Sequence, residues 1–65
     1  MKGTIKTIKE LGFGFIIAEG IGKDIFFHSN KLVGISFDEL REGDSVTFDV
    51  TDTEKGPVAI NVQRA

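Results

Sequence analysis

The 65-residue sequence has no cysteine, tryptophan or tyrosine, and only one proline and one histidine. Without cysteine the chain can form neither a disulfide nor a thiolate metal site, so neither can reinforce the small core of so short a domain. The sequence also lacks an apolar run long enough to span a bilayer, and it lacks the pattern of a signal peptide. These absences are consistent with a reducing compartment, and we expect a soluble, cytoplasmic protein.

An excess of positive charge is missing as well. Eight Lys and Arg residues stand against ten Asp and Glu residues, which gives a formal net charge of −2. Strong nonspecific binding to duplex DNA is mostly electrostatic, so this balance argues against it. The charge is nevertheless segregated, because Lys2, Lys6 and Lys9 come early and many acids lie between Asp38 and Glu54. The early lysines could form a local basic patch or could simply serve solubility.

No arrangement of residues typical of an enzyme or a metal site is present. His28 is the only histidine, and in a strand its neighbour Ser29 would point to the opposite face. Asp24 would lie roughly 13 Å away along the same strand. The chain has no GxxxxGK phosphate-binding loop and no HExxH motif, and its acids do not form a calcium loop. We therefore expect no enzymatic activity, no metal and no cofactor.

Five segments have the composition of short β-strands and are separated by turn signals: residues 2–9, 13–19, 24–28, 44–51, and a last segment that begins at Pro57. Ile5 and Ile8 break the alternation of the first segment, which predicts a bulge near Thr7. An open five-stranded sheet would leave long edges exposed to aggregation. The pattern therefore predicts one all-β domain, residues 1–65, folded as a small, closed or nearly closed five-stranded antiparallel barrel.

Two short runs, residues 12–16 (GFGFI) and 25–28 (IFFH), carry the clearest functional signal. Side chains alternate between the faces of a strand, so paired strands would place Phe13, Phe15, Phe26 and His28 on one face. The opposite, more aliphatic face would be the core, and we expect the aromatic face to lie in water. The expected core residues are Ile5, Ile16, Ile25, Phe27, Val46, Phe48, Val50, Ile60 and Val62.

Three exposed phenylalanines side by side are unfavourable unless a ligand docks on them. Flat rings with polar neighbours suit single-stranded nucleic acid, because every base has a face that can stack. Gly12 and Gly14 would leave the backbone bare and allow a ligand to approach closely. Two alternatives stay open: another part of the chain could cover the rings, and His28 could be an ordinary surface residue rather than a partner for a base.

The same residues resemble a known family. The run 12–16 is similar to the first ribonucleoprotein motif of the cold-shock domain, and the run 25–28 resembles the second. Further matches follow in order over essentially the whole chain: Phe37, Leu40-Arg41-Glu42-Gly43, Gly56-Pro57, Ala59 and Asn61-Val62. The resemblance implies a five-stranded OB-fold barrel that binds single-stranded DNA and RNA. It also implies an RNA chaperone that melts weak secondary structure.

By this resemblance, the residues that stack on bases are Phe13, Phe15, Phe26, His28 and Phe37. Lys6 and Lys55 match positions where the family often has a basic residue near the nucleic-acid backbone. We expect these two lysines, together with Lys9, to follow the phosphates. The expected partner is a pyrimidine-rich single strand, and the expected state is a monomer, although the long connection at residues 33–43 could act as the hinge of a strand-swapped dimer.

The chain also departs from the family pattern at several positions, and three of them bear directly on nucleic-acid binding. Thr7 and Ser29 stand where the family usually has Trp and Phe, and Leu11 stands where it usually has Lys. Each stacked base is worth roughly 1–3 kcal/mol, so losing two platforms would cost on the order of 2–6 kcal/mol. We therefore expect micromolar rather than nanomolar affinity. An OB-fold module that binds a protein, or a swapped dimer with weakened nucleic-acid binding, is the alternative.

Overall fold

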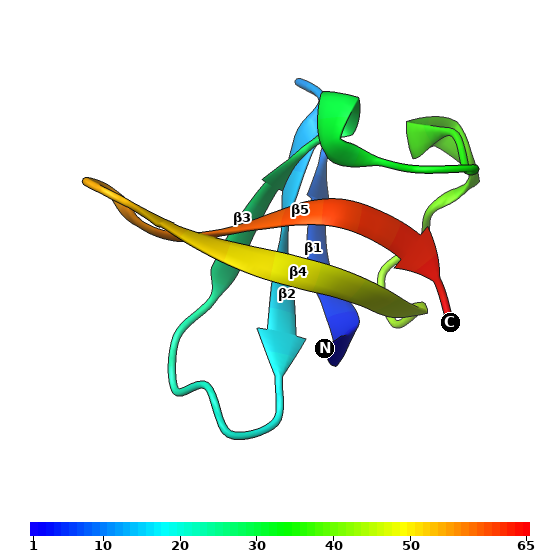
Figure 1. Ribbon diagram of the computed structural model, residues 1–65. Helices are drawn as coiled ribbons and strands as arrows, with labels where there is room; N and C mark the ends of the chain where they lie inside the picture. Colours follow the sequence, from blue (N-terminus) through cyan, green and yellow to red (C-terminus); the bar gives the residue numbers. More distant parts are fainter.

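Short β-rich runs separated by glycine turns fold as five strands: β1 (Lys2–Lys9), β2 (Phe13–Ala18), β3 (Ile25–His28), β4 (Ser45–Thr53) and β5 (Gly56–Arg64). The computed structural model describes all residues, 1–65. Two 3-10 turns, η1 (Ser29–Lys31) and η2 (Phe37–Glu39), lie in the long connection between β3 and β4, which runs across the top of the barrel (Figure 1). Neither helical turn is long and apolar enough to cross a membrane. β1 has the bounds expected from the sequence, and each of the other strands differs from its expected bounds by one or two residues at an end.

The strands close into a barrel in the order β1-β2-β3-β5-β4, because β1 pairs with both β2 and β4. The five-stranded barrel is therefore confirmed. The expectation that every pairing is antiparallel needs one correction, since β3 and β5 pair in parallel with Phe26 opposite Val58. Strand directions cannot alternate all the way around a closed ring with an odd number of strands. One parallel pairing is therefore unavoidable in this fold.

The predicted bulge is present in β1. The register with β2 shifts between Ile5, which is opposite Ile16, and Thr7, which is opposite Phe15. Lys6 is the extra residue at this point. The bulge lets Ile5 point into the core while Thr7, only two residues later, takes its place beside the outward-facing Phe15. It also bends β1, which helps the sheet to close.

The core lies inside the barrel and consists of ten buried hydrophobic residues: Ile5, Ile16, Ala18, Ile25, Phe27, Leu40, Val46, Phe48, Ala59 and Val62. Every expected core residue is confirmed except Val50 and Ile60. Val50 is half-buried and packs against the core rather than within it. Leu40 comes from the connection after η2 and closes one end of the barrel.

The expectation for Ile60 was wrong because β5 does not alternate regularly. Asn61 has a φ of 51°, in the left-handed region that asparagine tolerates better than most residues. The register with β4 shifts at the same place, between Thr47 and Asp49. Ala59 and Val62 consequently point inward, three residues apart, and Ile60 is left half-buried outside the core cluster.

Gly14 serves the core rather than the outer surface, which corrects the expectation that it clears space for a ligand. It is buried, and a Cβ at this position would lie 2.8 Å from Cε1 of Phe27 and would collide with the backbone oxygen of Thr7. Gly12 has a different role, because its φ of 97° allows the tight turn between β1 and β2.

We predict that Gly14→Ala destabilises the fold by about 1–3 kcal/mol, because the added methyl group overpacks the core. Gly22→Ala is the matched control, since nothing lies within 4 Å of its would-be Cβ. Urea unfolding followed by far-UV circular dichroism suits a chain without Trp or Tyr. Equal midpoints for the two variants would show that Gly14 is not packed as described.

Candidate nucleic-acid interface

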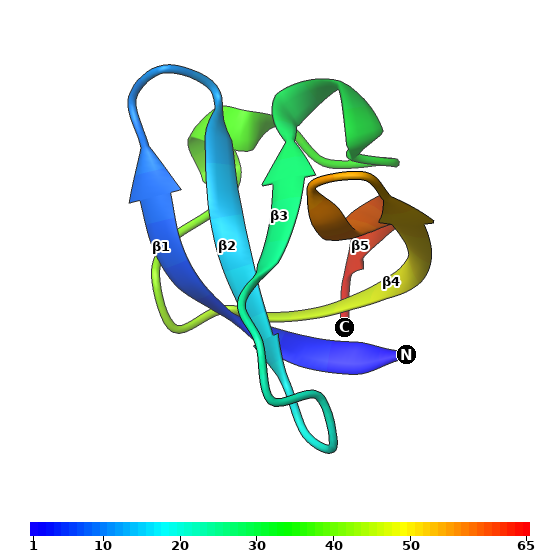
Figure 2. The same cartoon turned by 90° about the vertical axis from the view of Figure 1, so that its left-hand side faces the viewer.

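The outer face of β1, β2 and β3, which lie together at the front of Figure 2, carries most of the predicted binding residues. The register of β2 and β3 places Phe15 opposite Phe26 and Phe13 opposite His28. The alternating positions Ile16 and Ile25 are fully buried. The sheet therefore separates these rings from the buried core as the sequence pattern predicts.

Three of these side chains form one cluster, which we call the aromatic platform: Phe13, Phe15 and Phe26. The rings of Phe13 and Phe26 stack with centroids 5.5 Å apart and planes 29° apart. Phe15 meets both edge-on, at 6.2 Å and 5.9 Å. All three are half-buried, so no other part of the chain covers them completely. Their mutual contacts hold the rings in place before any ligand arrives.

His28 extends this surface at its upper end, where its side chain is exposed. Its Nδ1 accepts a hydrogen bond of 3.3 Å from the backbone N–H of Asn30, which caps η1. This bond orients the imidazole ring and leaves Nε2 facing away from the cap. His28 can therefore offer both a ring face and one free nitrogen to a ligand.

Phe37 does not join the aromatic platform. It lies on η2, half-buried, and its ring packs against the buried Phe27 with centroids 6.3 Å apart. The same side chain lines a surface hollow of about 280 Å³ next to the end of β1. Sequence reasoning did not identify this hollow, because its residues come from segments about thirty positions apart with no shared motif.

The three predicted lysines lie in different surroundings. Lys6 forms an ion pair with Asp24, with Nζ at 2.9 and 3.1 Å from the two carboxylate oxygens. Both side chains are 47% exposed. Because an exposed pair contributes only up to about 1 kcal/mol, a phosphate could replace Asp24 as the partner of Lys6.

Lys9 is exposed beside the aromatic platform, paired in register with Phe13, and it takes part in no ion pair. Lys55 lies further away, in the turn between β4 and β5, a hairpin that projects from the barrel beyond β3 (Figure 1). Lys9 thus lies beside the rings and Lys6 lies at the bulge of β1 next to Thr7, whereas Lys55 lies in the β4–β5 hairpin.

Two exposed apolar residues near the platform were not among the predicted site residues. Leu11, at the tip of the β1–β2 turn, is 85% exposed, and Ile17 on β2 is 47% exposed. Alternation alone places Ile17 on the outer face with Phe15, so that signal was available in the sequence. No group of three or more metal-binding side chains is present.

The model of the 'Cold-shock' DNA-binding domain matches residues 1–65 of this chain. The chain belongs to the cold-shock domain family. The family resemblance of the two aromatic motifs is thereby confirmed, and with it an OB-type barrel that binds nucleic acid.

Individual relatives agree with the family assignment. The chain is 45% identical over 64 residues to "Cold shock protein ScoF" of Streptomyces coelicolor, covering 97% of this chain and 96% of that protein. It is 43% identical over 63 residues to "Cold shock-like protein CspC" of Escherichia coli K12, covering 95% and 91%. Among solved structures, "drosophila Unr CSD456" matches with a TM-score of 0.84 and 33% identity. That match covers 98% of this cold-shock domain but only 26% of the longer chain.

The separation of the two faces predicts opposite effects of two phenylalanine truncations on stability. Phe48 is buried, so Phe48→Ala should cost about 3–5 kcal/mol, enough to unfold a domain of this size. Phe15→Ala removes a half-exposed ring and should leave the far-UV spectrum and most of the stability intact. Thermal unfolding of both variants is the measurement, and a similar loss in each would mean that the two faces are assigned wrongly.

Proposed function

We propose that this cold-shock domain binds single-stranded RNA and DNA by stacking bases on the aromatic platform, and that it acts as an RNA chaperone. The observation that carries the proposal is the contact between three half-exposed phenylalanine rings on one face of a closed barrel. Such a cluster is unfavourable in water unless flat, apolar surfaces cover it. Bases of any sequence can do so once a strand is unpaired.

The affinity follows from the number of stacking side chains. Phe13, Phe15 and Phe26 form the platform, and His28 adds a further flat side chain at its end. Thr7, which lies opposite Phe15, has no aromatic ring on which a base could stack. At roughly 1–3 kcal/mol for each stacked base, this set supports micromolar binding to a short pyrimidine-rich strand. Binding of that strength favours unpaired segments and melts weak structure, while stable duplexes stay intact.

The positive charge that contacts the ligand comes from a few lysines rather than from the net charge of the protein. Lys9 and Lys6 flank the rings on β1, and Lys55 lies on the neighbouring hairpin. We infer that these cations contact phosphates, with Lys6 exchanging Asp24 for the ligand. The net charge of −2 keeps nonspecific binding weak elsewhere on the surface. We further propose that the domain works as a monomer in the cytoplasm.

The test is fluorescence anisotropy of end-labelled oligo-dT and oligo-U heptamers at two salt concentrations, with the label on the nucleic acid because the protein has no Trp or Tyr. We predict micromolar dissociation constants that rise with salt. Phe15→Ala should weaken binding about 5-fold to 150-fold, the loss of one stacked base. Ile17→Ala is the matched control, because this residue lies on the same face of the same strand outside the ring cluster.

Equal binding by the Phe15→Ala and Ile17→Ala variants would contradict stacking on the platform, and low-nanomolar affinity at physiological salt would contradict the count of stacking residues.

One observation favours a second candidate function, the docking of an apolar protein partner or a second copy of the chain: Leu11 leaves an apolar tip 85% exposed beside the rings. Apolar docking should barely respond to salt, whereas phosphate contacts weaken steeply as salt rises.

A further inference from the structure

The turn between β1 and β2, residues 10–12, carries the most exposed large hydrophobic side chain of the protein. Leu11 is 85% exposed, compared with 60% for Met1. Figure 2 shows this turn at the upper end of β1 and β2. Phe13, which begins β2, is paired in register with Lys9, the last residue of β1. Leu11 therefore lies just beyond the end of the aromatic platform.

A single exposed leucine is common on protein surfaces, but this one stands on a turn that is fixed at both ends. The N–H of Gly12 donates to the backbone oxygen of Lys9 at 3.1 Å, which closes the turn. The backbone oxygen of Gly12 accepts a hydrogen bond of 2.8 Å from the N–H of Ser29, which ties the turn to η1. Backbone bonds thus hold Leu11 out in water, and a ligand can cover it with little loss of backbone entropy.

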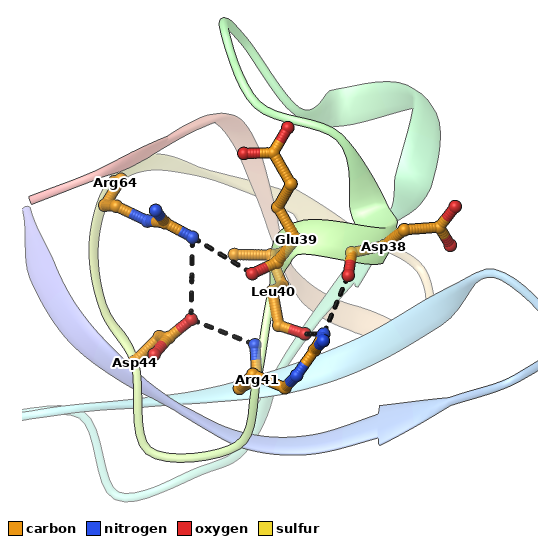
Figure 3. A network of polar contacts seen from close by, with 6 residues as sticks. All are labelled: Asp38, Glu39, Leu40, Arg41, Asp44 and Arg64. Atoms are coloured by element: carbon orange, nitrogen blue, oxygen red, sulfur yellow. Dashed lines mark hydrogen bonds and ion pairs between the residues drawn. The ribbon is translucent and has the colours of Figure 1, made fainter.

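The long connection at the same end of the barrel offers no comparable side chain. Arg41 Nη1 donates to the backbone oxygen of Asp38 at 2.7 Å. Arg64 Nη2 donates to the backbone oxygen of Glu39 at 3.0 Å, which ties the connection to β5 (Figure 3). The other apolar side chains of this connection are buried or packed against the core, and only Val33 is exposed. The β1–β2 turn alone presents an apolar tip beside the platform.

The turn is close enough to the platform for a bound strand to reach it. Leu11 is two residues from Phe13, so their Cα atoms are at most about 7 Å apart. Successive bases of a stacked strand are about 3.4 Å apart along the helix axis, so this distance corresponds to about two base steps. A duplex that continues from a strand stacked on Phe13 would therefore meet Leu11 with its end.

We propose that Leu11 is a wedge that covers the terminal base pair of a duplex whose unpaired strand lies on the aromatic platform. The inference rests on the proposed function, because the platform holds the unpaired strand. The terminal pair at such a junction has lost a stacking partner and exposes a flat, apolar face to water. Apolar side chains, leucine among them, occupy the space between base steps in proteins that unstack duplexes. By covering this face, Leu11 favours the opened junction over the closed stem.

The apolar character of residue 11 is what this role needs. A lysine, which the family usually has here, would have to lose water from its charge to cover a base pair. It would also lose more side-chain entropy than a leucine on being ordered. Lys9 is exposed, takes part in no ion pair and is available for a phosphate at the junction. Glu10 belongs to the lining of the surface hollow beside Phe37.

The experiment measures how much protein opens a weak RNA hairpin that carries an oligo-U heptamer tail at its 5′ or its 3′ end. A fluorophore and a quencher on the stem report opening, and anisotropy of the labelled tail alone reports binding to the platform. We expect opening with one tail polarity only, because the turn lies at one end of the platform. Leu11→Ser should raise the protein concentration for half-opening about 3-fold to 10-fold, the effect of burying roughly half of a leucine side chain.

Two further variants separate the wedge from a general loss of binding. Leu11→Met keeps an apolar side chain and should open the hairpin as the unmodified protein does. Val33→Ser is the matched control, because Val33 is also an exposed apolar residue but its backbone N–H is bonded to Val62 on β5. Affinity for the tail alone and the unfolding curve should be the same for all of these proteins, since both positions are exposed.

Binding of the tail with equal opening by the unmodified protein and Leu11→Ser, or with no opening by either, would overturn the wedge and leave the platform in place. Equal opening with both tail polarities would overturn it too. Self-association of the protein that Leu11→Ser abolishes would overturn it in favour of a second copy as the partner of Leu11. No binding of the tail by the unmodified protein would overturn the proposed function together with the wedge.

Discussion

The pairing register between β2 and β3 is the constraint on which the rest of this structure depends. In that register Ile16 lies opposite Ile25 and Phe15 opposite Phe26. Because side chains alternate, one pairing buries the isoleucines and turns the phenylalanines outward. A slip of one residue would exchange the two faces, placing the rings in the barrel and the isoleucines in water. The core and the aromatic platform are therefore consequences of a single pairing.

The rest of the barrel keeps this surface rigid and accessible. The bulge at Lys6 turns Thr7 toward Phe15, and closure of the ring by β4 and β5 leaves no open sheet edge. Gly14 leaves room for Phe27 beneath the platform, and Phe37 packs on that same ring. Preformed surfaces of this kind lose little entropy on binding. The proposed interface thus needs no loop to fold around the nucleic acid.

Sequence patterns predicted the features that depend on local alternation: the strands, the bulge near Thr7, the inward isoleucines and the outward rings. They failed where the decisive partner is distant or the backbone is irregular. The left-handed Asn61 moved Ile60 out of the core, and only the packing of Phe27 shows why residue 14 is a glycine. The ion pair of Lys6 with Asp24 and the lining of the surface hollow beside Phe37 join residues far apart in the chain. No spacing rule could bring these residues together.

The central claim is that the outer face of β1, β2 and β3 receives the nucleic acid. The most direct test is a titration of the ¹⁵N-labelled protein with unlabelled oligo-dT, followed by backbone amide chemical shifts. The account predicts the largest changes around Thr7, Phe15 and Phe26, with the outer face of β4, at Thr47 and Asp49, unaffected. Changes centred on β4, or spread evenly over the barrel, would contradict it.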